Sequence, residues 1–163
     1  MKDITKTDYM IGPFVCYLNS KGILAEIKQA VGRSKIIEFI SKNKRYICYF
    51  KYAASASGSN DKTWSFSYTK NDIILIKQVL TNMKNTDNFW AVNLCKASDT
   101  DTEIAILNLN ELKRALGIRI FGEKNKISYK ISRKSSSNYL HCLGSQGQDV
   151  RILQDLNEIF DNL

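Results

Sequence analysis

Alternating apolar and polar residues give the clearest signal of a strand in this chain. In the segment TWSFSYT, Trp64, Phe66 and Tyr68 alternate with Ser65 and Ser67. Successive side chains of a strand point to opposite faces of a sheet, so this pattern predicts one aromatic face and one face of hydroxyl groups. We expect the aromatic face to lie in the core and the serine face to meet water or a partner.

Runs of β-branched and aromatic residues predict further strands on either side of this segment. Two of them form a hairpin around the polar turn 41–44, and two more flank the polar turn SDTDT. The remaining strands follow in the last third of the chain. These strands are expected at residues 35–40, 45–52, 89–97, 103–109, 119–121, 126–133 and 139–143.

Four helices are expected from apolar residues at helical spacing. The first is predicted at Ser20–Val31, and a glycine follows its C-terminal end. Two others begin with capping-box pairs and extend to about residues 85 and 116. The last is expected near the C-terminus. The capping pairs are Thr69 with Asp72 and Asn108 with Glu111, and the buried face of the last helix comprises Val150, Leu153, Leu156 and Phe160.

This set of elements predicts a single α+β domain of 163 residues with mostly antiparallel sheets. Up to residue 96 the expected order is helix, three strands, helix, strand. That order is similar to the common core of restriction-endonuclease-like nucleases. The resemblance lies in the order of the elements and not in any residue motif.

The resemblance implies where catalytic acids would stand. Such nucleases hold a metal ion with an acidic residue on the second strand and a carboxylate-x-Lys on the third, because hard oxygen ligands position the ion and its water. Neither RYICYFKY nor TWSFSYTK contains an acidic residue, and the Glu-x-Lys of residues 26–28 falls in the predicted first helix. We therefore expect a protein without catalysis, for which a metal-dependent nuclease is the nearest enzyme class.

Other catalytic and metal-binding patterns are also missing. The chain contains neither of the glycine-rich phosphate loops of nucleotide-binding proteins. Its four cysteines are far apart among apolar residues, which indicates buried thiols. His141 and Cys142 are neighbours on a predicted strand and point to opposite faces. The acids Asp99, Asp101 and Glu103 fit a solvated hairpin tip. We expect no cofactor and no metal ion.

Positive charge is concentrated in two stretches of a chain whose net charge is +8. Lysine and arginine dominate residues 21–51 and 113–134, whereas the stretch from Asp149 onward is net acidic. A basic surface favours anionic partners, since each neutralised phosphate releases counterions, although a basic composition also serves solubility. The candidate phosphate-binding residues are Lys42, Lys44, Arg45, Arg119, Lys126, Lys130, Arg133 and Lys134.

Five of these residues are expected to converge on one face of the C-terminal hairpin. Lys126 and Lys130 have the same parity on the strand KISYKISR, so they project together. Arg133 leaves the end of this strand and Lys134 lies in the serine-rich turn that follows. Arg119 is the fifth member.

A second candidate anion site lies in the segment GSQGQDVR. Its G-x-x-G stands just before the last predicted helix, where free backbone N–H groups and the helix dipole attract anions. The candidate residues of this site are Ser145, Gly147, Gln148 and Arg151.

The segment AASASGSN, residues 53–60, joins two predicted strands with more residues than a turn requires. Its small side chains lose much conformational entropy when they are ordered. We expect a tip that contacts a partner and becomes ordered there, rather than a simple tether.

Two function classes remain. The first is a non-catalytic domain that binds DNA or RNA through phosphate contacts. The second is a protein-binding inhibitor or accessory module, such as a phage or mobile-element factor that binds an acidic surface of a larger nucleic-acid-processing machine. The segment MKDITKTDYM lacks the apolar core of a secretory signal, and no apolar run is long enough to span a membrane. We expect a cytoplasmic protein with no membrane partner.

Overall fold

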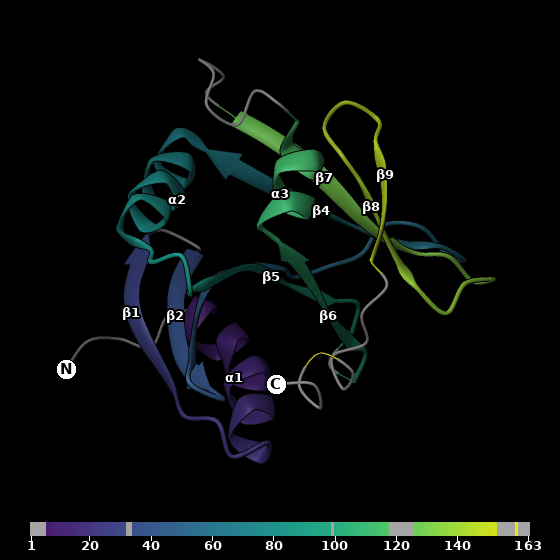
Figure 1. Cartoon of the computed structure of the whole chain (residues 1–163). Helices are drawn as coiled ribbons and strands as arrows, with labels where there is room; N and C mark the ends of the chain where they lie inside the picture. Colours follow the sequence, from purple (N-terminus) through teal and green to yellow (C-terminus); the bar gives the residue numbers. More distant parts are fainter. Residues whose placement is uncertain (1–5, 32–33, 99, 118–125, 153–158, 160–163) are drawn as a thin grey trace.

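A computed structural model shows how the predicted elements are arranged (Figure 1). It describes residues 6–31, 34–98, 100–117, 126–152 and 159. In chain order the elements are α1 (Lys6–Ser20), β1 (Ala25–Val31), β2 (Ser34–Ser41), β3 (Lys44–Ala53), β4 (Lys62–Thr69), α2 (Lys70–Asn82), β5 (Asn88–Lys96), β6 (Thr102–Asn108), α3 (Leu109–Leu116), β7 (Lys126–Arg133), β8 (Leu140–Leu143) and β9 (Asp149–Ile152).

The strands form two sheets. Sheet A has five strands in the order β1-β2-β3-β5-β6, and sheet B has four in the order β4-β7-β8-β9. Neighbouring strands are antiparallel except β3 and β5, which run parallel because the chain passes through β4 and α2 between them. The predicted α+β class is therefore confirmed, and the described residues contain three helices.

The two sheets and α1 form three layers. One hydrophobic cluster fills the space between sheets A and B and includes residues of α2 and α3. A second cluster lies between α1 and the other face of sheet A, where Phe14 and Leu18 are fully buried against Phe50 and Val92. Figure 1 shows α1 against sheet A, with β4 and β7–β9 on the side away from this helix. Sheet B therefore keeps one face outside the core.

The aromatic face of β4 lies in the core, as its alternation predicts. Trp64, Phe66 and Tyr68 are at most 1% exposed, while Ser65 between them is exposed. Both predicted capping boxes are also confirmed at the starts of α2 and α3. A capping box satisfies backbone N–H groups that the first helical turn leaves without acceptors, so each helix begins where its side chains supply them.

The first predicted helix is wrong. The helix α1 lies earlier, at Lys6–Ser20, and ends before Gly22, whose φ of 73° is in the left-handed region that favours glycine. Of the residues assigned to that helix, Ala25–Val31 form β1 instead, where Ile27 pairs with Ile37 of β2. Apolar residues at irregular spacing in this stretch imitate a helical face. Conversely, Gly12 and Pro13 in the middle of α1 hide its helical signal.

The last predicted helix is wrong at its start. Val150 lies on β9, where it pairs with Cys142 of β8, while Leu153, Leu156 and Phe160 lie outside the described residues. The predicted strand at 119–121 also lies outside them. Because β1 adds a strand, four strands and not three precede α2. The fold therefore gives no support to the resemblance with restriction-endonuclease-like nucleases, which depended on that order.

The small-residue segment 53–60 contains part of a turn that is closed by backbone hydrogen bonds. Ser57 and Thr63 exchange two backbone hydrogen bonds of 2.8 and 2.9 Å, which extend β4 backward as a short hairpin. Gly58 has a φ of 90°, and a Cβ atom there would lie 2.2 Å from the carbonyl oxygen of Asp61. Only glycine fits this position. Contact of this tip with a partner stays a prediction.

The cysteines differ in their surroundings. Cys48, Cys95 and Cys142 are buried in the core as predicted, whereas Cys16 is exposed on α1. Burial raises the pKa of the Cys142 thiol to about 12. The expectation that all the cysteines are core thiols is therefore wrong for Cys16, which lies on the outer face of its helix.

A buried chain of hydrogen bonds joins the two sheets through the core. Asn93, at the centre of β5, has no exposed surface, and its Oδ1 accepts a hydrogen bond of 2.7 Å from the Tyr129 hydroxyl of β7. The hydroxyl oxygens of Tyr129 and Tyr68 are 2.9 Å apart. Since the single proton of Tyr129 is directed to Asn93, Tyr68 donates to Tyr129. Asn93 in turn donates to the Ala91 carbonyl at 3.2 Å.

Replacing Tyr129 with phenylalanine should destabilise the protein by about 1–3 kcal/mol, because Asn93 Oδ1 and the Tyr68 hydroxyl both lose a buried partner. Urea unfolding followed by circular dichroism measures this change. Tyr9→Phe is the matched control at a side chain that is 73% exposed, and we expect it to change the free energy of unfolding by no more than about 0.5 kcal/mol. Equal stability of the two variants would show that this chain of buried hydrogen bonds does not stabilise the core.

Candidate nucleic-acid interface

The outward face of sheet B carries hydroxyl and ammonium groups. On β7 the exposed positions alternate with the buried residues Ile127, Tyr129 and Ile131. Each exposed position pairs across the sheet with an outward residue of β4. We call this surface the serine–lysine face, and it comprises Ser65, Ser67, Thr69, Lys126, Ser128 and Lys130.

The two strands place these groups in a regular array. Lys130 stands opposite Ser65, and Lys126 stands opposite Thr69. Between these pairs, the hydroxyl oxygens of Ser67 and Ser128 are 2.9 Å apart. The small side chains leave the surface open around the two longer lysines.

The serine–lysine face is positively charged without nearby compensation on its own strands. Neither β4 nor β7 contains an aspartate or glutamate. Among the described residues, Lys126 and Lys130 form no ion pair with a carboxylate. Both lysines are exposed, so their charge is available to an anionic partner.

A pocket opens at one end of this face, where Lys126 and Thr69 form part of its rim. Its volume is about 500 Å³, and it lies between β3, β4 and the first turn of α2. We call it the junction pocket. Its lining residues are Ser34, Lys51, Tyr52, Ser65, Phe66, Ser67, Thr69, Asn71, Asp72 and Lys126.

Asp72 forms the buried floor of the junction pocket. Its Oδ1 accepts hydrogen bonds from Ser34, at 2.9 Å, and from the Tyr49 hydroxyl. Its Oδ2 accepts from the backbone N–H of Thr69 at 2.7 Å and from the Thr69 hydroxyl at 2.9 Å, and it lies 3.1 Å from Lys51 Nζ. Four segments of the chain therefore meet at one carboxylate.

These contacts decide the charge of Asp72. Burial by itself would raise the pKa of the carboxyl group. The hydrogen bonds from Tyr49 and the Thr69 backbone, together with the charge of Lys51, outweigh burial and lower the pKa to about 2. Asp72 is therefore ionised at neutral pH.

Lys51 is held inside the pocket by the same network. Its side chain is 12% exposed, and its Nζ donates to Ser34 Oγ at 3.0 Å and pairs with Asp72. The ammonium group also lies 4.9 Å from the centre of the Tyr68 ring, which favours the cation. Burial lowers the pKa of Lys51, while Asp72 acts to raise it.

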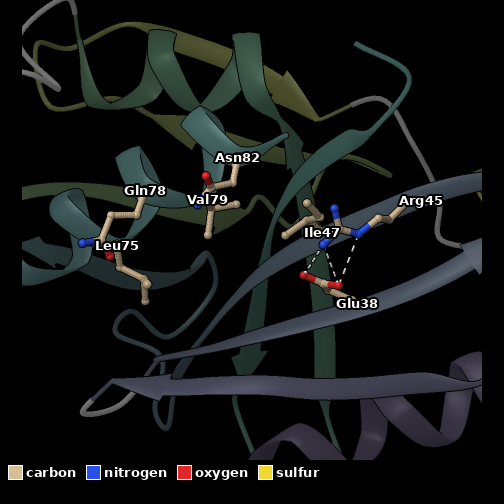
Figure 2. Close-up of a pocket in the computed structure, with 7 residues that line it drawn as sticks. All are labelled: Glu38, Arg45, Ile47, Leu75, Gln78, Val79 and Asn82. Atoms are coloured by element: carbon tan, nitrogen blue, oxygen red, sulfur yellow. Dashed lines mark hydrogen bonds and ion pairs between the residues drawn. The ribbon is translucent and has the colours of Figure 1, made fainter. Parts of the chain in front are cut away.

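The predicted cluster at the β2–β3 turn is divided. Lys42 and Lys44 are exposed, whereas Arg45 forms hydrogen bonds with Glu38 at 2.8 and 3.2 Å and with Asp87 at 3.2 Å. Figure 2 shows Arg45 and Glu38 joined on one side of a pocket of about 450 Å³, opposite side chains of α2. Because two carboxylates already hold its guanidinium, Arg45 is poorly placed to bind phosphate.

The predicted convergence of five cations is only partly present. Lys126 and Lys130 share the serine–lysine face, and Lys134 lies in the turn after β7. Arg133 is bonded to Glu103 of β6 on the inner side, where Nε is 3.0 Å from Oε2. Arg119 lies outside the described residues.

Two of the acids expected at a solvated hairpin tip form ion pairs between the sheets. Glu103 binds Arg133, and Asp101 pairs with Lys62 of β4. Both ion pairs cross from sheet A to sheet B at the same end of the core. Asp99 lies outside the described residues.

The predicted anion site at residues 144–151 does not have the expected geometry. A strand, β9, and not a helix, follows the G-x-x-G, so the segment does not precede the N-terminus of a helix. The N–H and the hydroxyl of Ser145 donate to the carbonyls of Ala115 and Leu116 at 2.8 and 2.9 Å. Gly147 and Gln148 complete the turn between β8 and β9. Arg151 lies on β9 opposite His141.

Ser137, His141 and Asp149 lie in the order of a hydrolase triad. Ser137 Oγ is 3.4 Å from His141 Nε2, and Asp149 Oδ1 is 3.4 Å from Nδ1. The second contact lacks hydrogen-bond geometry, and the Ser137 hydroxyl also binds the backbone of Tyr139 in a turn. Cys142 points into the core, away from His141, as the strand parity predicts. We interpret these residues as a turn and not as a nucleophilic site.

Two kinds of feature are absent from the described residues, 6–31, 34–98, 100–117, 126–152 and 159. No group of three or more histidine, cysteine, aspartate or glutamate side chains in this part of the chain is arranged to hold a metal ion. None of its helices combines the length and apolar character that a membrane span requires.

Replacing Asp72 with asparagine should destabilise the protein at pH 7 by about 3–5 kcal/mol, because Lys51 loses its buried counter-ion. Because the folded-state pKa of Asp72 lies below the unfolded value of about 3.9, wild-type stability should fall as pH drops through this interval toward about 2. The variant should lack this part of the pH dependence. Urea unfolding from pH 7 to pH 2 measures both effects.

Asp149→Asn is the control for this experiment, since that carboxylate is 60% exposed. We expect its effect at pH 7 to be within about 0.5 kcal/mol. If Asp72→Asn were as stable as this control, the carboxylate would not organise the pocket.

Comparison of the chain with models of known protein families, with curated proteins and with solved structures found no significant match. Function is therefore inferred from the geometry of the described residues.

Proposed function

We propose that this protein is a non-catalytic nucleic-acid-binding domain whose serine–lysine face contacts the phosphate backbone. The observation that supports this proposal is the exposed array of two lysines and four hydroxyl-bearing residues on β4 and β7, two strands without a carboxylate. Ammonium and hydroxyl groups are common partners of phosphate oxygens. The net charge of +8 adds long-range attraction for a polyanion.

The spacing of the lysines suits separate phosphates of one strand. Lys126 and Lys130 are four residues apart on β7, which corresponds to about 13 Å along an extended strand. A nucleic-acid strand of similar length contains about four nucleotides at the rise of B-form DNA. Between the lysines, one of the Ser67 and Ser128 hydroxyls donates to the other, and the second can donate a hydrogen bond to a phosphate in the middle of this interval.

The chemistry of this face favours binding that does not depend on base sequence. Its side chains lack the bidentate amide and guanidinium groups that read base edges, since it consists of serine, threonine and lysine. Exposed aromatic rings, on which single-stranded bases stack, are also missing from the face itself. Phosphate contact is therefore the main interaction that we propose.

A protein-binding module is the second candidate, and a different surface favours it. One of the two edge strands of sheet A is β1, next to which Leu24 and Ile40 are 85% and 69% exposed. An open strand edge with apolar side chains can accept a strand of a protein partner. Failure of the protein to bind nucleic acid would favour this candidate.

Reversing both charges of the face should weaken nucleic-acid binding. We expect Lys126→Glu combined with Lys130→Glu to lower the affinity for all oligonucleotide sequences alike by about tenfold or more near physiological salt. The slope of log affinity against log salt should become shallower by about 1.4–1.8, because two phosphate contacts are lost. Fluorescence anisotropy with duplex DNA, single-stranded DNA and RNA over a salt series measures both quantities.

The matched control is Lys42→Glu combined with Lys44→Glu, which makes the same change of charge at the β2–β3 turn. It should reduce affinity much less and leave the salt slope nearly unchanged. A greater loss in this control would assign binding to the turn, and equal binding by both folded variants and the wild type would contradict the proposal.

A further inference from the structure

We propose that the junction pocket binds the terminal phosphate of a nucleic-acid strand that lies on the serine–lysine face. This inference rests on the proposed function and adds recognition of the strand end.

The face and the pocket are continuous. Ser65, Ser67, Thr69 and Lys126 belong to both, so a strand that follows β4 and β7 reaches the pocket without leaving the polar surface. Lys126 is exposed on β7 and also lines the pocket, so its charge is shared by the two surfaces. A phosphate in the pocket is therefore a direct extension of a backbone bound to the face.

Several groups that line the pocket can donate hydrogen bonds to a phosphate. The hydrogen bond and ion pair of Lys51 with Ser34 and Asp72 engage two of its three N–H groups, and its ammonium group also lies beside the Tyr68 ring. Asn71 is exposed in the first turn of α2 and is one of the residues that line the pocket. The N–H of Asp72 in this turn donates to Thr69 Oγ1, whereas the N–H groups of Lys70 and Asn71 have no acceptors within the helix, and the helix dipole favours an anion near them.

The buried carboxylate does not compete for this role. Asp72 accepts hydrogen bonds from Ser34, Tyr49 and Thr69 and pairs with Lys51, so its oxygens are already occupied. Its negative charge is balanced by Lys51. The charge of Lys126 then remains to attract an anion into the pocket.

A terminal phosphate fits this pocket better than an internal one. The floor consists of Lys51 and Asp72, whose side chains are 12% and 7% exposed, so the site is closed on its inner side. An internal phosphodiester needs room for a chain on both sides. A terminal phosphate enters from one side, and it carries nearly two negative charges at neutral pH instead of one.

The test compares internally labelled single-stranded oligonucleotides of one sequence that end in a 5′-phosphate, a 3′-phosphate or hydroxyl groups only. One of the two phosphorylated strands should bind about tenfold more tightly than the hydroxyl-ended strand, through added charge-assisted hydrogen bonds. Asn71→Asp should remove this preference because it places a carboxylate beside the phosphate. An acidic residue in the first turn favours the helix, so this variant should remain folded.

Gln78→Glu is the matched control, since it adds the same charge to an exposed position of α2 that lines a different pocket. This control should keep the preference for a phosphorylated end. Equal binding of all three oligonucleotides by the wild type would overturn the inference while leaving the proposed function intact. A preference that persists in Asn71→Asp would overturn it as well.

Calorimetric titration with adenosine 5′-monophosphate and with inorganic phosphate distinguishes a phosphate at a strand end from free phosphate as the ligand of the pocket. Tighter binding of the nucleotide, lost in Asn71→Asp, supports a strand end, whereas equal binding of both ligands assigns the pocket to free phosphate and overturns the inference. If no oligonucleotide binds, the proposed function fails. The titration with adenosine 5′-monophosphate then tests the pocket by itself. Binding of this nucleotide that Asn71→Asp abolishes supports a phosphate site in the pocket, and absence of nucleotide binding overturns that site.

Discussion

The buried carboxylate of Asp72 is the constraint on which the organisation of the site depends. A charged group at this depth is stable only if hydrogen bonds and a counter-ion replace the water that it loses. Ser34 of β2, Tyr49 and Lys51 of β3, and Thr69 at the end of β4 supply them. Satisfying one side chain therefore fixes the positions of three strands and the start of α2. The junction pocket is the space left outside this network.

The same alternation of residues builds the core and the proposed interface. On β4 and β7 every second residue is buried between the sheets, and this inner layer contains the hydrogen bond from Tyr129 to Asn93. The residues between them are serine, threonine and lysine, which cannot be buried without partners and therefore face water. Two ion pairs, one of them between Arg133 and Glu103, join the sheets at one end of the core. A stable inner face thus presents a chemically uniform outer face.

Local patterns in the sequence predict part of this structure, and contacts between distant residues explain what they miss. The alternation around Trp64 and the capping boxes depend on neighbours in the chain, and both were correct. The spacing of apolar residues in β1 imitates a helix, and only pairing with β2 identifies it as a strand. Ser34 and Asp72 are separated by 38 positions, so no local pattern indicates that they meet in a pocket. Arg133 finds its partner Glu103 across the core for the same reason.

In the proposed complex, nucleic acid binds to the outer surface of β4 and β7, and its strand ends at the first turn of α2. An NMR titration of ¹⁵N-labelled protein with a phosphorylated single-stranded oligonucleotide would locate this contact, because each backbone amide reports on its own surroundings. We expect chemical-shift changes at residues 65–71 and 126–130, with small changes elsewhere. Changes centred on the turn 42–44 or on β1, or no changes at a saturating concentration of the oligonucleotide, would contradict the proposed complex.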